Sequence, residues 1–176
     1  MIYNKLRKDV LNMIYTELTK KAMNIAYKAH DGQFDKCGYP YIFHPIHVAE
    51  SILTIDVAAL RYVITPKNLT YEIEEYLICI ALLHDVVEDS DITIEDLAKE
   101  FPEEVVHAVD LLTHKEGVDY FDYIYAINAN YLAKVVKVQD ILHNKNKDRE
   151  ALIIDEDQAK KDARDEKYRK ALSILL

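Results

Sequence analysis

The chain has 176 residues, the usual length of one domain, and half of them are hydrophobic. No run approaches the roughly 18 apolar residues that a membrane span needs, and no secretory signal precedes the first amphipathic segment, so we expect a cytoplasmic protein. The formal net charge is −9, and residues 51–144 carry 18 acidic against 6 basic side chains, which argues against a nucleic-acid partner.

Only three glycines and four prolines are present, too few for the many tight turns of an all-β chain. We therefore predict an all-α fold, in a single domain that spans residues 1–176. Its core is expected to reach about residue 150, and residues 155–176 are expected to form a terminal helix that docks on it. The two cysteines, Cys37 and Cys79, are far apart and are expected to be free thiols.

Apolar residues at steps of three and four predict a first amphipathic helix over residues 9–30, followed by an exposed loop over residues 33–41. Pro45 suits the first position of the next helix, and its ring favours an extended conformation for His44 just outside that helix. His44 is thus either a metal ligand or a packed core histidine.

Residues 81–89 (ALLHDVVED) begin as an apolar helix, capped at Thr70, and end in four ionisable groups. If the helix continues, His84 faces Glu88, and Asp85 faces both Glu88 and Asp89. Carboxylates crowded in this way repel one another unless a cation lies among them. A divalent metal is the simplest remedy, and the alternative is a solvated end of a helix.

Further helices are predicted after the cap signature Thr93 to Asp96 and after Pro102, with a polar loop over residues 113–119 between the second of these and a helix over residues 120–129. The next helix, residues 132–144, places Asp140 within a strongly apolar segment. A charged residue there must be paired, either with Lys137 one turn earlier or with a metal.

Two imidazoles and two carboxylates from three segments have compatible chemistry for one metal site: His44, His84, Asp85 and Asp140. Nitrogen and oxygen ligands without thiolates suit Mn²⁺, Fe²⁺, Zn²⁺ or Mg²⁺. Such an ion activates water and binds a phosphate oxygen, and Glu88 or Asp89 can orient or deprotonate that water. The residues therefore predict hydrolysis of a phosphate ester or anhydride.

Three blocks in this order resemble a known family: residues 38–45 (GYPYIFHP), residues 83–89 (LHDVVED) and residues 137–140 (KVQD) with Asn144. They are similar to the HD-domain phosphohydrolases, and more narrowly to the hydrolase domain of the RelA/SpoT proteins and the stand-alone small alarmone hydrolases. The resemblance covers nearly the whole chain. It implies a helical HD-domain bundle with the metal site in its centre, and no synthetase domain is expected to follow.

The resemblance also implies an activity, the manganese-dependent removal of the 3′-pyrophosphate from guanosine tetra- or pentaphosphate. Glu88 and Asp89 then assist the attacking water, Lys36 holds the nucleotide, and Asn144 lies near the sugar. Lys137 and Lys115 complete the predicted substrate-binding set. The expected partner is thus a small phosphorylated nucleotide, with neither nucleic acid nor membrane, and no feature indicates an oligomeric state.

Two residues depart from the family pattern. Asp35 stands where the family commonly has an arginine that stacks on the base, and Ile141 stands where alarmone hydrolases usually have Arg or Lys. These departures keep two alternatives open. One is a nucleotide phosphomonoesterase, including one that acts on the 2′-phosphate of a nicotinamide cofactor, and the other is a non-catalytic helical module that senses a nucleotide.

Overall fold

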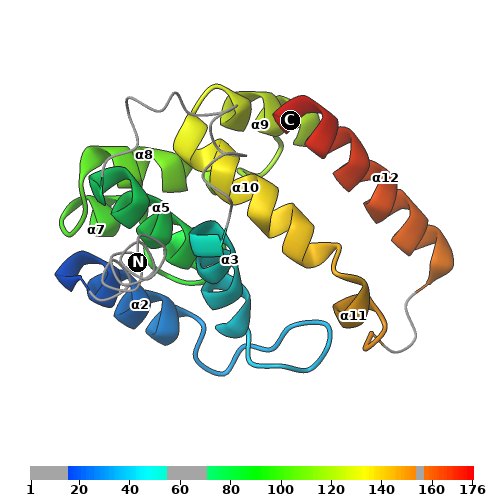
Figure 1. The fold of residues 1–176 in the computed structure, drawn as a ribbon, viewed down its shortest axis with the longest axis horizontal. Coiled ribbons are helices and arrows are strands. Elements are labelled where there is room, and N and C mark those ends of the chain that lie inside the picture. The colour runs from blue at the N-terminus through cyan, green and yellow to red at the C-terminus, as the bar shows by residue number, and fades with distance from the viewer. Residues whose placement is uncertain (1–15, 55–70, 154–156) are drawn as a thin grey trace, which may run out of the picture.

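The computed structural model describes residues 16–54, 71–153 and 157–176, and these ranges consist of helices joined by loops (Figure 1). No strand occurs within these ranges, where a single isolated bridge pairs Phe34 with Pro40. The all-α prediction is confirmed. The helices are α2 (Glu17–Ala29), α3 (Phe43–Thr54), α5 (Tyr71–Leu83), α6 (Val86–Asp89), α7 (Ile94–Ala98), α8 (Glu103–Leu112), α9 (Tyr120–Asn128), α10 (Tyr131–Asn144), α11 (Lys147–Glu150) and α12 (Gln158–Leu175).

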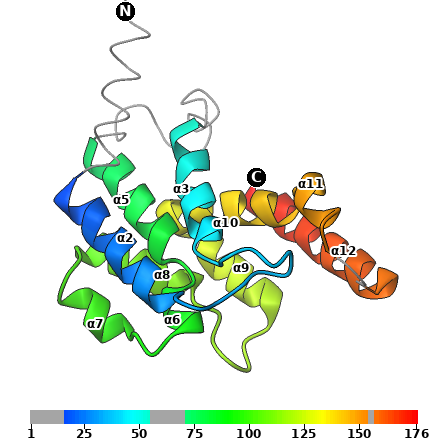
Figure 2. The ribbon, with the colours of Figure 1, turned by 90° about the horizontal axis from the view of Figure 1, so that it is seen from below.

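Helix α5 forms the centre of the fold. Every residue from Leu77 to Leu83 is buried, so this half of the helix is apolar on all sides, as a fully enclosed helix must be. It packs against α2, α3, α8 and α10, which surround it in two perpendicular views (Figures 1 and 2). The central position of α5 means that whatever follows Leu83 starts inside the molecule.

Helix α10 crosses the fold and carries a charged residue into the interior. Its buried face includes Val136 and Ile141, which are both fully enclosed, and the helix packs against α3, α5 and α9. Asp140 lies on this face and is only 5% exposed. The predicted helix over residues 132–144 is confirmed, and it starts one residue earlier, after the N-cap Asn130.

Capping explains several helix starts. Thr93 and Asp96 form the predicted capping box at the start of α7, with reciprocal bonds between side chains and backbone amides. The side chain of Asp119 accepts from the amides of the first turn of α9, and so ends the predicted loop. The predicted start of the first helix at residues 9–15 and the predicted cap at residue 70 lie outside the described residues.

The predicted start of α3 was wrong. The helix begins at Phe43, so that His44 lies in its first turn and Pro45 is its third residue. Proline loses no hydrogen bond there, because the first four amides of a helix have no acceptor within it. The amides of Phe43 and His44 donate instead to the carbonyls of Pro40 and Tyr41, at 3.1 and 2.8 Å, which offsets the preference of a residue before proline for extended backbone.

The continuous helix predicted over residues 81–89 was also wrong. Helix α5 ends at Leu83, and α6 starts after Asp85. The ring of His84 turns back so that its Nδ1 lies 2.8 Å from the carbonyl of Ala81, and this contact occupies an acceptor of the last turn of α5. Because the helix is interrupted, the predicted sharing of one helix face by His84 and Glu88 does not apply, and no hydrogen bond or ion pair joins them among the described residues.

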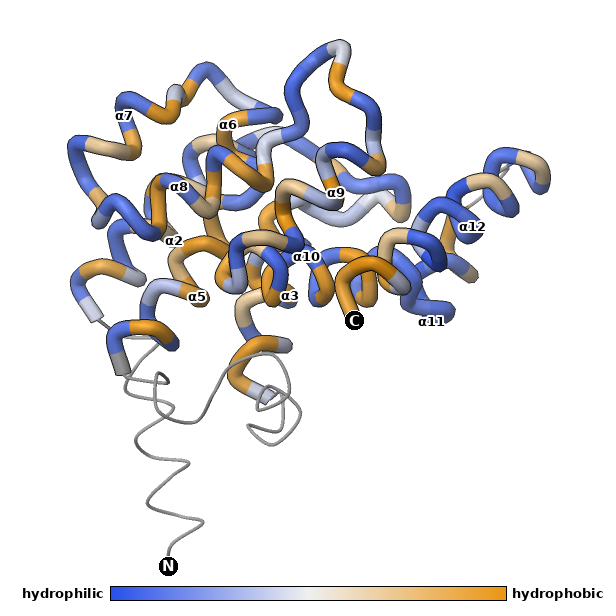
Figure 3. Tube along the Cα trace, turned by 90° about the horizontal axis from the view of Figure 1, so that it is seen from above, coloured by the Kyte–Doolittle hydropathy of each residue, from blue (hydrophilic) through white to orange (hydrophobic). Residues whose placement is uncertain are grey.

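Helix α12 is the most hydrophilic of the long helices (Figure 3). Its apolar contact is narrow: Ala171 and Leu175 are buried, and the helix packs against α9 and α10. The proposed division into a core to about residue 150 and a terminal helix from residue 155 stays a prediction. None of the described helices is both long and apolar enough to cross a membrane.

Candidate metal centre

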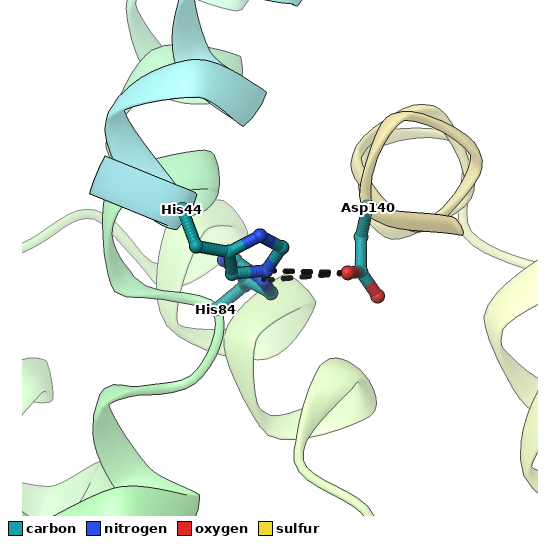
Figure 4. A group of neighbouring side chains, drawn as sticks. All are labelled: His44, His84 and Asp140. Carbon is teal, nitrogen blue, oxygen red and sulfur yellow. Dashed lines mark hydrogen bonds and ion pairs between the residues drawn. The ribbon is translucent and has the colours of Figure 1, made fainter. Parts of the chain in front are cut away.

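Three buried side chains converge where α3, the end of α5 and α10 meet (Figure 4). Nε2 of His44 lies 3.2 Å from Nε2 of His84 and 3.3 Å from Oδ1 of Asp140, and Nε2 of His84 lies 4.0 Å from the same oxygen. Ligand atoms that share one ion at about 2.0–2.2 Å lie about 3 Å apart, or more when the coordination is open. The three donors therefore fit a single ion.

Asp85 brings a fourth donor to the same point. Its Oδ2 lies 3.1 Å from Nε2 of His84 and 3.5 Å from Nε2 of His44, and it accepts a 2.6 Å hydrogen bond from the hydroxyl of Tyr41. Burial, followed by the charge of Asp85, raises the pKa of Tyr41, so this hydroxyl stays protonated as a donor. All four residues predicted as ligands are thus brought together, and their assignment to a metal stays a prediction.

Nδ1 of His84 forms a hydrogen bond with the backbone. Nδ1 of His84 faces the carbonyl of Ala81, which only accepts, so Nδ1 carries a proton and Nε2 is the nitrogen left to bind a metal. A histidine bound through one ring nitrogen to a backbone carbonyl is a common arrangement of metal ligands, because it fixes both the ring and its tautomer. His84 is therefore prepared to bind a metal through Nε2.

Neighbouring charges shift the pKa values of His44 and Asp140 in opposite directions. Burial alone would lower the pKa of His44, but hydrogen bonds and charges of Asp140 and Asp85 outweigh this effect and raise it to about 9. Burial alone would raise the pKa of Asp140, and the charges of Lys137 and the two histidines more than offset it, so the pKa is lowered. The carboxylates thus stay ionised and favour a cation between them.

Lys137 and Asn144 hold Asp140 in place. Nζ of Lys137 lies 2.9 Å from Oδ2 of Asp140, and Nδ2 of Asn144 donates to Oδ1 at 2.6 Å. The pairing with Lys137 that was weighed for Asp140 is present, and the other oxygen faces the histidines, while the role of Asp140 as a metal ligand stays a prediction. The side chain of Lys137 is only 15% exposed and lies over the ring of Tyr123, so it contacts the centre from inside.

Glu88 and Asp89 lie at the solvent side of the centre, on α6. Partial burial and the negative charge of Asp85 raise the pKa of both carboxyl groups. The backbone of His114, in the loop after α8, forms a hydrogen bond with Glu88, and the side chain of Gln33 donates to the carbonyl of Asp89 at 2.7 Å. These contacts fix α6 beside the centre and leave both carboxylates reachable from solvent.

A cavity of about 310 Å³ opens beside His44 and collects cationic and aromatic side chains. Lys36, predicted to hold a nucleotide, lines it together with Asn144. Lys115, also predicted to bind substrate, pairs with Asp110 at 2.9 Å with its side chain 62% exposed, and none of its contacts among the described residues reaches the cavity. The residues around the cavity are Phe34, Asp35, Lys36, Cys37, Tyr41, His44, Asn144, Arg149, Glu150, Ile153, Arg164 and Tyr168.

Asp35 is neutralised rather than exposed to the cavity as a bare charge. Its Oδ2 lies 2.7 Å from Nη2 of Arg149, and its Oδ1 accepts from the amides of Cys37 and Tyr39 at 2.8 and 3.0 Å. Burial opposes ionisation, but these hydrogen bonds outweigh it and lower the pKa of Asp35. Ile141, the other departure from the family pattern, is fully buried in the core.

Two residues of the site were missed in the sequence. His143 follows Asp140 by three positions on α10, and its Nδ1 lies 2.6 Å from Nδ1 of His44. Arg149 on α11 brings Nη1 to 3.1 Å from Nδ1 of His143. The spacing of His143 from Asp140 was a readable signal, whereas nothing local in the sequence connects Arg149 with His44 or Asp35.

Comparison with known proteins gives relatives that are named as 3′-pyrophosphohydrolases or as GTP pyrophosphokinases. The chain is 33% identical over 141 residues to a guanosine-3′,5′-bis(diphosphate) 3′-pyrophosphohydrolase of Vibrio cholerae, which covers 76% of this chain and 17% of the relative. It is 33% identical over 138 residues to a probable GTP pyrophosphokinase of Mycobacterium leprae, covering 72% and 15%, and 28% identical over 156 residues to a 3′-pyrophosphohydrolase of Borreliella burgdorferi, covering 80% and 21%. The chain thus spans about a fifth of these relatives or less.

A solved structure shares the fold. The metazoan ortholog of SpoT, described as hydrolysing ppGpp, superposes with a TM-score of 0.64 at 23% identity, over 91% of this chain and 86% of the other. The chain belongs to the HD-domain family of the RelA/SpoT type. No protein-family model matches it. In this HD domain the histidine and aspartate side chains of the family resemblance are the ones that meet among α3, α5 and α10.

Proposed function

We propose that the chain is a metal-dependent hydrolase of phosphorylated nucleotides, and that it removes the 3′-pyrophosphate of guanosine tetra- or pentaphosphate. The observation that carries this proposal is the convergence of His44, His84, Asp85 and Asp140 from three segments at 3.1–4.0 Å, beside a cavity whose walls include a lysine and two arginines. The names of the relatives support the substrate.

The four side chains would hold one divalent ion, and two neutral imidazoles with two carboxylates suit Mn²⁺ as well as Fe²⁺, Zn²⁺ or Mg²⁺. We favour Mn²⁺ because of the family resemblance. When bound, such an ion would lower the pKa of a water molecule and would attract a phosphate oxygen through its positive charge. Tyr41, Lys137 and Asn144 keep the carboxylates in position for it through the hydrogen bonds and the ion pair described above.

Glu88 and Asp89 act on the attacking water. Their raised pKa values make them better proton acceptors than ordinary surface carboxylates, since a general base works best when its pKa lies nearer the working pH. One of them takes a proton as the water oxygen attacks the phosphorus next to the sugar. The bond from that phosphorus to the 3′ oxygen breaks, the 3′ oxygen is protonated, and pyrophosphate leaves.

The cavity beside His44 accommodates the rest of the nucleotide. Lys36 places positive charge on its wall, beside Arg149 and Arg164, which pair with Asp35 and Glu150 at 2.7 and 3.4 Å. Cationic side chains of this kind suit the remaining phosphate groups. Phe34 and Tyr168 provide aromatic surface for the base. Phosphates bound here lie next to His44, so that a neighbouring diphosphate reaches the metal.

A second candidate function is a nucleotide phosphomonoesterase, and Asp35 favours it. Because Asp35 and Arg149 pair with each other at 2.7 Å, this edge of the cavity presents no free arginine for the base. A nucleotide whose base is held in another way would fit equally well, including a nicotinamide cofactor with a 2′-phosphate.

Product analysis tests the proposal. Protein loaded with Mn²⁺ is incubated with guanosine tetraphosphate and with a panel of nucleotides, and the products are separated by anion-exchange chromatography. We expect guanosine diphosphate and pyrophosphate in equal amounts. Release of orthophosphate alone would replace the first function by the second, and tight binding without turnover would indicate a sensing module.

A further inference from the structure

The two histidines His44 and His143 share one proton. Their Nδ1 atoms lie 2.6 Å apart, and the rings stack with centroids 4.8 Å apart and 25° between their planes. One nitrogen must therefore donate and the other must accept, and the pair alone does not determine which does so. The choice matters because it sets which nitrogen of His44 keeps a lone pair.

Arg149 settles this choice. Its Nη1 lies 3.1 Å from Nδ1 of His143, and a guanidinium group carries donors only. Nδ1 of His143 must therefore accept, its own proton must sit on Nε2, and the shared proton must belong to Nδ1 of His44. Nε2 of His44, which faces His84 and Asp140, is then the nitrogen available to a metal.

Asp35 holds the guanidinium of Arg149, and two other side chains hold the backbone of this residue. Asp35 binds Nη2 at 2.7 Å, and the Sγ of Cys37 donates to the carbonyl of Arg149 at 3.3 Å. The side chain of Asn146 caps α11 and accepts from the amide of Arg149 at 3.3 Å. The pair of Asp35 and Arg149 is mostly enclosed, with side chains 11% and 24% exposed, so it retains more of its strength than a surface pair.

We propose that Arg149, anchored by Asp35, is a positioning residue that fixes the tautomers of His143 and His44 and thereby directs Nε2 of His44 toward the metal. This inference rests on the proposed metal site. Arg149 thus connects the loop after α2, through α11 and α10, to the ligand on α3. The aspartate that departs from the family pattern gains a role of its own, as the anchor of this arginine.

Nitrogen NMR of the histidine side chains tests the tautomers directly in the metal-free protein at a pH of about 10, above the raised pKa of about 9 of His44, where both imidazoles are neutral. The signals of His143 are assigned by their loss in His143→Gln. In the wild-type protein we expect His143 with its proton on Nε2. In Arg149→Met, which has a similar length and no donor, we expect a mixture of the two tautomers. A side chain that only supported the fold would lower thermal stability without moving these signals.

Metal affinity provides the second measurement, by titration calorimetry with Mn²⁺. Loss of a group that orients a ligand from outside typically lowers affinity about 10–100-fold, and we expect this range for Arg149→Met. Arg149→Lys keeps a charged donor and is expected to lie between Arg149→Met and the wild type. Asp35→Asn is expected to weaken binding less than Arg149→Met. Arg169→Met, which breaks the exposed pair with Glu166, is the matched control and should change neither measurement.

Unchanged tautomers in Arg149→Met would overturn the inference, and so would unchanged Mn²⁺ affinity. Wild-type protein that binds no Mn²⁺ would instead refute the proposed metal site, and with it the direction of His44 toward a metal. The NMR result then still decides whether Arg149 sets the two tautomers. The two failures are therefore distinguishable.

Discussion

Asp140 shows how one buried carboxylate serves two neighbours. Lys137 binds one oxygen at 2.9 Å, and the other oxygen faces His44 at 3.3 Å. A carboxylate enclosed to this degree would be costly without partners on both sides. The apolar surroundings of Asp140 were readable in the sequence, but the division of its oxygens was not, because it depends on how α3 and α10 cross.

Asp85→Asn should weaken metal binding at least tenfold. The substitution removes a charge that faces both Nε2 atoms at 3.1 and 3.5 Å, while it keeps the size of the side chain. Metal content after dialysis against Mn²⁺ measures the effect. Asp91→Asn, at an exposed position six residues later, is the control, and equal metal content in the two variants would contradict the ligand assignment.

Glu88→Gln should separate binding from turnover. The amide cannot accept a proton from water, so turnover of guanosine tetraphosphate is expected to fall by about 10²–10⁴-fold while the metal stays bound. Initial rates and metal content are measured on the same preparation. Glu95→Gln, on the exposed face of α7, serves as the control. If Glu88→Gln hydrolyses guanosine tetraphosphate at the normal rate, Glu88 is not the base, and Asp89 is the remaining candidate.

His143 and Arg149 mark the limit of what could be predicted residue by residue. The ligands were found because each breaks an expected pattern, as a charge in an apolar segment or a histidine beside a proline. Arg149 breaks no pattern in a segment rich in mixed charges. Its contact with Asp35 joins residues 114 positions apart and exists only in the folded chain.

At the scale of elements, most helices could be predicted, and the errors share a cause. The capping box at Thr93 and the loop before α9 are local features and were predicted correctly. The ends of α3 and α5 were placed incorrectly because contacts with the carbonyls of Tyr41 and Ala81 decide them. Both errors fall on metal-site segments, where local backbone preference gives way to the position of a side chain.

The loop between α2 and α3 should depend on the ionisation of Asp35. Since the pKa of Asp35 is lowered in the folded protein, its stabilising effect is present above its ordinary value of 3.8 and is lost as the pH falls below it. Asp35→Asn is expected to lower the free energy of unfolding by about 1–2 kcal/mol at pH 7.

Urea unfolding of the metal-free protein and the variant, compared from pH 7 downward, measures this effect. The difference between the two proteins should shrink toward zero once Asp35 is protonated in the folded state. A difference that stays constant over the whole range would show that Asp35 stabilises the loop through its shape rather than its charge.

For the whole molecule, the distribution of charge matches the two sides of the site. Residues 51–144 hold the acidic excess and supply His84, Asp85 and Asp140, while residues 145–176 balance nine basic against eight acidic side chains and supply Arg149 and Arg164. The sequence showed these two blocks, but not that the second one faces the first. The fold brings them together across the cavity.

Metal binding should stabilise the whole fold, because the ligands come from three segments that unfolding separates. Mn²⁺ at a hundred times its dissociation constant would add about 2.7 kcal/mol, which raises the melting temperature by about 5–10 °C for a chain of this size. Scanning fluorimetry with and without Mn²⁺ measures the shift. Asp140→Asn should show a much smaller shift, and an equal one would place the stabilising ion elsewhere.

The most direct test of the proposed centre is the position of the ion itself. Crystals grown with Mn²⁺ are measured at an X-ray energy just above the manganese absorption edge, and an anomalous difference map locates the metal. We expect one strong peak bonded to Nε2 of His44, Nε2 of His84 and the carboxylates of Asp85 and Asp140. A map with no peak among these four side chains, at a Mn²⁺ concentration that supports turnover, would contradict the metal centre.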